Sequence, residues 1–402
     1  MRLRTLPVLG ALAALGLLVS LALFTPKPTK AMPPFAQAYG LQCSTCHTMV
    51  PLLNAYGRYI QYTGYAALDR HTLAKALPVW LDEAMLYDSG PAVGAGTGTA
   101  RFSFGNFAIH AIGYAAPNIT YHVQQWLVQG DESGGLDTAW VAWSGLLNHQ
   151  GHLFVGKYIT PAPSPYSQDF ELDGPAASTS LVGEHDWSQT SYGNRWGTKF
   201  AYLPKYLDLE AGWAFSSDDL NGITDFNPGD KTFMWKAAYI RPKSPLEFGV
   251  FGSLGSIPVS TGQDSYHSVA GYVQVDPDMH WRPGFLGIYQ SNYDGNPGLD
   301  AVTSTIPLGP TTSRGASAEI YEPVLHGNVL IGFKHDFVDG GAGNSISNGD
   351  SINVGFNVPH FNYLHGYLET NLGGNSENFG GTGGPTWKGM LWLTLPVSRK
   401  PD

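Results

Sequence analysis

The sequence predicts a mainly β fold, a transmembrane β-barrel of about 16 strands preceded by a short helical segment. Three observations predict the barrel. Charged residues make up 13% of the 402 residues, against about 25% in ordinary soluble domains. Glycine contributes 50 residues, and aromatic residues another 13%. Apolar and polar residues alternate over stretches of about 9 to 11 residues, the length of a membrane-crossing strand.

The alternation is clearest in three stretches. Residues 351–358 place Ile352, Val354, Phe356 and Val358 on one face and polar or small residues on the other. Residues 207–215 and 387–395 alternate in the same way. Together with noisier segments, they give about 16 candidate strands, an even number as expected for a bacterial barrel. The candidates are 79–87, 101–113, 118–128, 137–144, 152–160, 195–203, 207–215, 232–240, 246–252, 267–275, 285–292, 314–321, 328–335, 352–358, 362–370 and 387–396.

The connections between these candidates tend to alternate in length. Short connections include 115–118, 148–151, 204–206 and 241–245, and long ones include 161–194, 216–231, 293–313, 336–351 and 371–386. Outer-membrane barrels have short periplasmic turns and long outer loops, so both ends of the predicted barrel lie on the periplasmic side. The long loops are rich in acidic residues, which would concentrate cations at the outer mouth or simply keep the loops solvated. A soluble β-sandwich or propeller also alternates, but neither needs such low charge, and no repeat of fixed period is visible.

The first residues have the pattern of a secretory signal. Arg2 and Arg4 precede an apolar run, and a small-residue cleavage site ends at Ala31. Residues 1–31 are therefore predicted to be a signal peptide, with an uncleaved inner-membrane anchor as the alternative. No later apolar stretch reaches the length of about 18 residues that a spanning helix needs. The net charge of −10 argues against nucleic acid as a partner.

The only two cysteines form a Cys-x-x-Cys-His motif, made of Cys43, Cys46 and His47. This is the attachment signature of a c-type haem. Two thiols at this spacing add across the two vinyl groups of one porphyrin edge, and the following histidine is the proximal iron ligand. A redox Cys-x-x-Cys would want a thioredoxin-like βαβ context, and a zinc site would want a fourth ligand at a matching spacing. The motif therefore predicts one covalent haem c.

Residues 32–78 form the predicted haem segment. Phe35–Leu41 has the pattern of a helical turn, and Pro51–Tyr65 that of a second helix with Pro51 at its first position. The segment is below the size at which a core usually stabilises itself, so we expect the haem and the following barrel, residues 79–402, to complete that core.

The sixth iron ligand is not fixed by the sequence. His71 and Met85 are the nearest candidates downstream of the motif, and an open position or a distant ligand is the alternative. His110, His122 and His365 lie on predicted strands and could line the lumen. Isolated histidines on strands are more often simply polar lumen residues.

Residues 35–65 resemble the N-terminal segment of the fused cytochrome–porin iron oxidases, outer-membrane proteins of iron-oxidising bacteria. The shared features are an aromatic-x-x-x-Tyr-Gly lead, the haem motif, a Pro-x-Leu-Asn-x-Tyr-Gly stretch and a closing Gly-Tyr. Residues 137–143 and 155–158 are similar, more weakly, to strands of such barrels. In this family one c-type haem precedes a porin-like barrel, so the resemblance implies that Cys43, Cys46 and His47 bind the haem.

The resemblance also implies a function. Extracellular Fe(II) would be oxidised at the outer membrane of a Gram-negative bacterium, and the electron would pass through the haem to a periplasmic cytochrome. As an enzyme, the chain would be an Fe(II):cytochrome c oxidoreductase that transfers one electron. No residue fixes iron as the donor, so a conduit for another donor stays open. The other hypotheses are a solute porin with a haem plug or redox gate, and a secreted soluble haem protein. The haem segment is expected on the periplasmic side or in the barrel lumen.

Overall fold

The fold is that of a computed structural model. It describes residues 34–73, 79–88, 101–129, 132–162, 194–215, 231–259, 262–277, 282–295, 310–339, 346–358, 364–374 and 386–396. The predicted signal peptide, residues 1–31, lies outside the described residues. Within the described ranges, no helix has both the length and the apolar character needed to cross a membrane.

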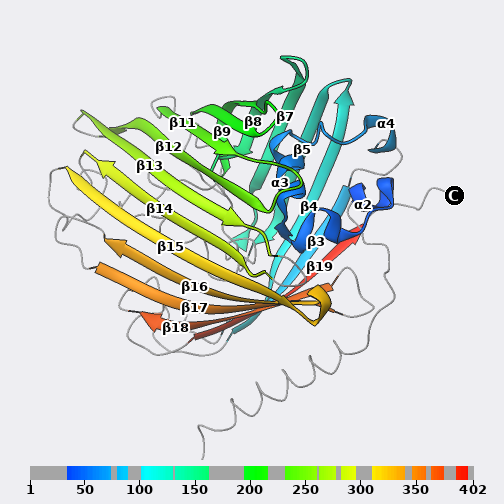
Figure 1. Ribbon diagram of the computed structural model, residues 1–402, viewed down its shortest axis with the longest axis vertical. Helices are drawn as coiled ribbons and strands as arrows, with labels where there is room; N and C mark the ends of the chain where they lie inside the picture. Colours follow the sequence, from blue (N-terminus) through cyan, green and yellow to red (C-terminus); the bar gives the residue numbers. More distant parts are fainter. Residues whose placement is uncertain are drawn as a thin grey trace, which may run out of the picture.

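Sixteen long antiparallel strands close into a barrel, in which β3 pairs with β19 (Figure 1). A two-residue strand, β6 (Glu132–Ser133), extends the end of β5. The long strands are β3 (Val79–Asp88), β4 (Arg101–Ala116), β5 (Ile119–Gln129), β7 (Leu136–Leu146), β8 (Gly151–Ile159), β9 (Asn194–Tyr202), β10 (Leu207–Ala214), β11 (Lys231–Tyr239), β12 (Leu246–Val259), β13 (Gly262–Val275), β14 (Gly284–Asp294), β15 (Thr311–Val324), β16 (Val329–Asp339), β17 (Ile346–Asn357), β18 (Leu364–Gly374) and β19 (Thr386–Pro396). Every predicted strand coincides with one of these, so the predicted barrel is confirmed.

The wall is apolar outside and polar inside. In β10, Trp213 is 40% exposed whereas Asp208 is 0% exposed. The same alternation runs through β7, where Val141 and Trp143 are exposed and Trp140, Ala142 and Ser144 are buried. A soluble monomer rarely exposes a large continuous apolar surface, because water disfavours it. The outer face is therefore suited to lipid and the inner face to polar contents.

The two ends of the barrel differ in their connections. Residues 117–118, 147–150, 203–206, 240–245 and 325–328 are short links at one end, which we call the short-turn end. Most links at the other end are longer, and most of their residues lie outside the described ranges. The exception is the link between β12 and β13, where only residues 260–261 separate two strands of 14 residues each.

The N-terminal segment, residues 34–73, consists of short elements beside β3, β4 and β5 (Figure 1). They are α2 (Pro34–Tyr39), η1 (Cys43–Thr45), β1 (His47–Met49), β2 (Leu52–Leu53), α3 (Ala55–Tyr62) and α4 (Arg70–Leu73). Its partners lie near the short-turn end. Tyr114, just before the link 117–118, donates from its hydroxyl to the carbonyl of Leu68 at 2.8 Å.

The predicted helix at Pro51–Tyr65 begins later than expected. Pro51 lies in the turn between β1 and β2, and α3 starts at Ala55. Asn54 is the N-cap, and its side-chain oxygen accepts from the backbone N–H of Gly57 at 3.0 Å. Asparagine is a strong N-cap, so it sets the start of the helix in place of the proline. The predicted helical turn at Phe35–Leu41 is confirmed by α2, apart from its last two residues.

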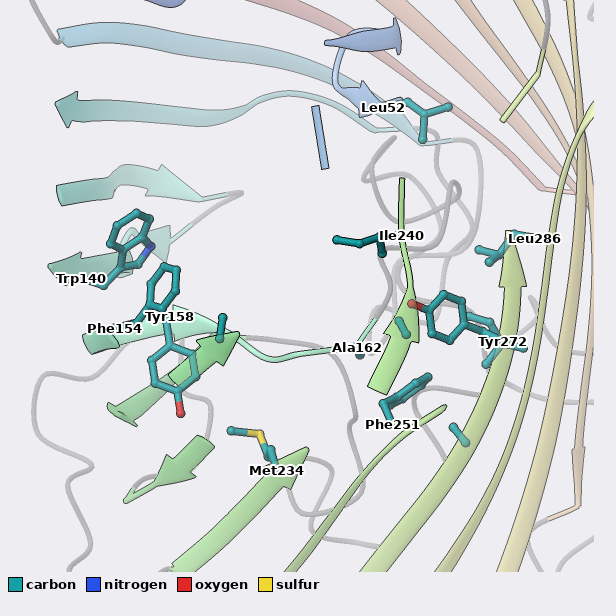
Figure 2. Packing of buried hydrophobic residues seen from close by; sticks show 14 of the residues in the cluster. Leu52, Trp140, Phe154, Tyr158, Ala162, Met234, Ile240, Phe251, Tyr272 and Leu286 are labelled. Atoms are coloured by element: carbon teal, nitrogen blue, oxygen red, sulfur yellow. The ribbon is translucent and has the colours of Figure 1, made fainter. Parts of the chain in front are cut away.

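The segment and the barrel share one hydrophobic core. Leu52 of β2 belongs to the same buried cluster as inward-facing residues of the wall such as Tyr272 of β13. Trp140 of β7 and Phe154 and Tyr158 of β8 lie in a row on another part of the wall (Figure 2). The segment therefore packs inside the barrel mouth and completes its core there.

Candidate functional site

The two cysteines of the motif lie in the first turn of the loop that enters the barrel. Cys43 begins η1 and Cys46 follows it, and neither thiol forms a disulfide. Burial, with a smaller effect of Cys46, raises the pKa of the Cys43 thiol to about 11. Burial also raises the pKa of Cys46. This setting is unlike that of redox cysteines, whose electropositive surroundings lower the pKa of the thiol.

The ring of His47 is fixed by the turn that follows it. Its Nδ1 lies 2.8 Å from the carbonyl oxygen of Pro51. A carbonyl can only accept, so Nδ1 carries the hydrogen and Nε2 keeps its lone pair. Burial lowers the pKa of His47, which favours the neutral ring. Histidines that bind metals are commonly oriented by such a bond from the second ring nitrogen.

Asn54 and Gly57 hold residues 43–53, which we call the motif loop, against α3. The side-chain amide of Asn54 donates to the carbonyls of Ser44 and Thr45, each at 3.2 Å. A Cβ on Gly57 would lie 2.1 Å from the carbonyl oxygen of Cys46, so only glycine allows this approach. Two free thiols and an oriented imidazole, on a loop held this tightly, fit the demands of a c-type haem.

The two predicted candidates for the sixth ligand lie elsewhere. His71 is exposed on α4, with its Nε2 3.5 Å from Nη2 of Arg70. Met85 shares a register row with Leu391, which is exposed on the outer face of the wall. The structure therefore does not bring either residue toward His47. His365 of β18 lies two residues before Tyr367, whose hydroxyl donates to the carbonyl of Val50, three residues after His47.

A charged contact joins α3 to β12 and to the end of β13. Arg58, 3% exposed, donates through Nε to Glu247 and through Nη1 to Asp276, both at 2.8 Å. Asp276 also accepts from the backbone N–H of Ala55 at 2.6 Å. We call Arg58, Glu247 and Asp276 the charged contact. Sequence reasoning did not single it out, although Arg58 is the only charged residue in α3.

The charged contact continues into the barrel wall. The hydroxyls of Tyr62 and Tyr272 both donate to Oε1 of Glu247, at 3.0 and 2.8 Å. Lys236 Nζ lies 3.7 Å from the same oxygen, 3.9 Å from the centre of the Tyr62 ring and 2.8 Å from Asp208. Buried charges are stable only when each of them has a partner. Arg58 and Tyr62 of the segment are partners of Glu247, so the segment helps to satisfy the buried charges of the wall.

An aromatic contact joins the segment to the opposite part of the wall. The ring of Tyr65 stacks on Trp140, with centroids 5.5 Å apart, and meets His122 edge-on at 5.8 Å. Phe35 of α2 lies 5.4 Å from the same tyrosine ring. We call Phe35, Tyr65, His122 and Trp140 the aromatic contact. His110, His122 and His365 all lie on the wall strands as predicted, and His110 pairs with Asp82 at 2.9 Å.

Among the described residues, no group of three or more His, Cys, Asp or Glu side chains is arranged to hold a metal ion.

Comparisons with known proteins identify the barrel and leave the segment without a counterpart in sequence. No family model and no curated protein matches the chain. Solved structures do match. An anion-selective porin from Comamonas acidovorans aligns with a TM-score of 0.54 at 12% identity, over 79% of this chain and 98% of that one. OmpF of Salmonella typhi, in complex with daunomycin, aligns at 0.53 and 10%, over 79% and 97%. OmpT of Vibrio cholerae aligns at 0.51 and 10%, over 79% and 98%. The barrel has a porin fold.

Proposed function

We propose that this chain is an outer-membrane electron-transfer protein whose N-terminal segment holds one covalent c-type haem inside the periplasmic mouth of a porin-like barrel. Cys43 and Cys46 would form the thioethers, and Nε2 of His47 would be the proximal ligand. The observation that carries the proposal is the motif loop itself, with its oriented His47, packed in the short-turn end of the barrel. When bound, the haem supplies a one-electron carrier, and the protein sets its environment.

Buried ion pairs on the inner wall support the proposed electron conduit. Several inward-facing charged side chains away from the segment are buried. On β16, Lys334 is 1% exposed and its ion-pair partner Asp336, 3.3 Å away, is 0% exposed. Side chains that line an open aqueous channel are accessible to water, as in porins. An electron needs no such channel, because it passes between closely packed groups.

The electron donor we propose is extracellular Fe(II), and the acceptor is a periplasmic cytochrome. This part rests on the resemblance of residues 35–65 to the fused cytochrome–porin iron oxidases. The acidic long loops of the sequence are consistent with a cationic donor. Another donor would use the same haem and the same barrel.

An anaerobic visible spectrum of the detergent-purified, oxidised protein tests the proposal. We expect the α band of a reduced c-type haem on adding Fe(II), with dithionite defining full reduction. The Cys43→Ala/Cys46→Ala variant should lose covalent haem, whereas His71→Ala, an exposed control, should keep it. Reduction by dithionite alone, across a range of pH, would replace iron by another donor. Absence of haem from the intact protein would overturn the proposal.

The porin fold favours a second candidate, a solute porin in which the segment is a haem plug or a redox gate. Liposome-swelling assays separate the candidates. Negligible flux in both haem oxidation states supports the conduit. Steady flux independent of oxidation state supports a porin with a plug, and flux that changes with oxidation state supports a gate.

A further inference from the structure

The inner face of β18 lies against the motif loop. The hydroxyl of Tyr367 donates to the carbonyl of Val50, three residues after His47. Strand β1, which begins with His47, packs against β17, the partner of β18. Side chains two residues apart on a strand share a face and stand about 7 Å apart. His365, two residues before Tyr367, therefore faces the same loop.

His365 is held in the same way as His47. It is 4% exposed, and its Nδ1 lies 2.9 Å from the side-chain oxygen Oδ1 of Asn357, its register partner on β17. An amide oxygen only accepts, so Nδ1 carries the hydrogen and Nε2 keeps its lone pair. Two imidazoles, each with its Nδ1 held by a hydrogen bond, thus face one region, one from the segment and one from the wall.

The other histidines of the wall are engaged differently. His110 directs Nε2 to Asp82 at 2.9 Å and stacks on Trp80. His122 approaches the hydroxyl of Tyr65 at 3.4 Å and belongs to the aromatic contact. His152 lies on β8, on the part of the wall that carries Phe154. Among these histidines, only His365 lies on β18, the strand whose Tyr367 contacts the motif loop.

We propose that Nε2 of His365 is the sixth ligand of the haem iron, opposite His47, an inference that rests on the proposed haem-binding function. One axial ligand would then come from the segment and the other from the barrel wall. Ligation by two imidazoles fills both axial positions, so the iron would be low-spin and suited to electron transfer rather than to binding small ligands. It would also make coordination a direct report of docking, because removing the segment from the barrel breaks one iron–nitrogen bond.

Electron paramagnetic resonance and near-infrared magnetic circular dichroism of the ferric, detergent-purified protein test this. The intact protein should show a low-spin iron with two nitrogen ligands. His365→Ala should lose that signal in favour of high-spin iron while keeping covalent haem, and added imidazole should restore it. His365→Met should give a thioether-to-iron charge-transfer band and a higher reduction potential. His152→Ala, a buried histidine of the same inner wall, should leave every signal unchanged.

The outcomes separate the two proposals. A high-spin or thioether-ligated intact protein would overturn the assignment of His365 and leave the haem in place. So would a His365→Ala variant that keeps the low-spin spectrum. An intact protein without covalent haem would overturn the proposed function and this inference with it. The spectrum of the intact protein can overturn the assignment of His365 without any variant. The proposal therefore stays testable even if a variant fails to fold.

Discussion

Two of the contacts that dock the segment to the barrel are of opposite kind. The charged contact concentrates its directional bonds on one side chain, Arg58, which serves two carboxylates. The aromatic contact spreads over rings from several elements, and Tyr65 stacks on Trp140 of the wall with centroids 5.5 Å apart. Charge gives a contact a unique geometry but makes it intolerant of a missing partner, whereas apolar packing degrades gradually. The segment thus has one contact that fixes its position and one that adds burial.

Removing the centre of the charged contact should have the largest effect. In Arg58→Ala, Asp276 stays buried without its cation and Glu247 keeps only Lys236, 3.7 Å away; breaking a buried ion pair in this way typically costs about 3–5 kcal/mol. We expect residues 34–73 to lose protection from hydrogen exchange and from limited proteolysis while the barrel stays folded. Arg58→Lys keeps the positive charge but loses the planar guanidinium that binds two carboxylates at once. Its protection should therefore lie between that of the intact protein and that of Arg58→Ala. Arg70→Ala, at the other end of the segment, is the control. Full protection in Arg58→Ala would show that the aromatic contact positions the segment unaided.

Weakening the aromatic contact should have a smaller effect. Tyr65→Ala removes the stacked ring and its buried area, a loss of about 2–3 kcal/mol. Tyr65→Phe should be nearly neutral, because the hydroxyl has only a long contact of 3.4 Å to His122. The same exchange experiment measures both variants. If Tyr65→Ala released the segment more completely than Arg58→Ala, the order of the two contacts would be reversed.

The smallest effect on docking is expected from Tyr62, whose neutral hydroxyl donates to Glu247 of the charged contact. Burial, followed by the charge of Glu247, raises the pKa of Tyr62 above its usual value. The folded state therefore holds the phenolic proton more tightly than the unfolded state. The stabilisation is complete below the unfolded pKa of about 10 and is lost as pH rises through the folded value.

Docking should accordingly weaken above about pH 10. Tyr62→Phe should make that alkaline loss less steep and cost about 1 kcal/mol at neutral pH. Tyr206→Phe, on an exposed turn, is the control. An identical alkaline profile in Tyr62→Phe and the intact protein would assign the loss to other groups.

The strands could be predicted from the sequence because their signal is local. Alternation with a period of two, as in β10, needs only neighbouring residues to be read. Their ends were harder. The predicted strand 246–252 continues in the structure to Val259. Residues such as Gly255 and Pro258 are typical of turns, but pairing with β13 holds them in the strand.

The candidate site could be predicted only where its chemistry is local. The spacing of Cys43, Cys46 and His47 identifies the haem motif by itself. The partners of Arg58 lie 189 and 218 residues away in the chain, a separation that no local pattern reports. Pro51 was misassigned because proline suits the first turn of a helix, whereas here the stronger N-cap, Asn54, starts the helix later.

The pairing of β3 with β19 also orders events in time. β3 follows the segment directly, and β19 is the last strand to be synthesised, so the barrel closes when the two ends of its sequence meet. Closure encloses the segment, which contacts β5 and β7 through Tyr65 and contacts β12, the end of β13 and β18 through Arg58 and Val50. Any machinery that attaches a haem to Cys43 and Cys46 needs access to those thiols. If the haem is attached before closure, the finished cofactor is built into the mouth as the barrel forms.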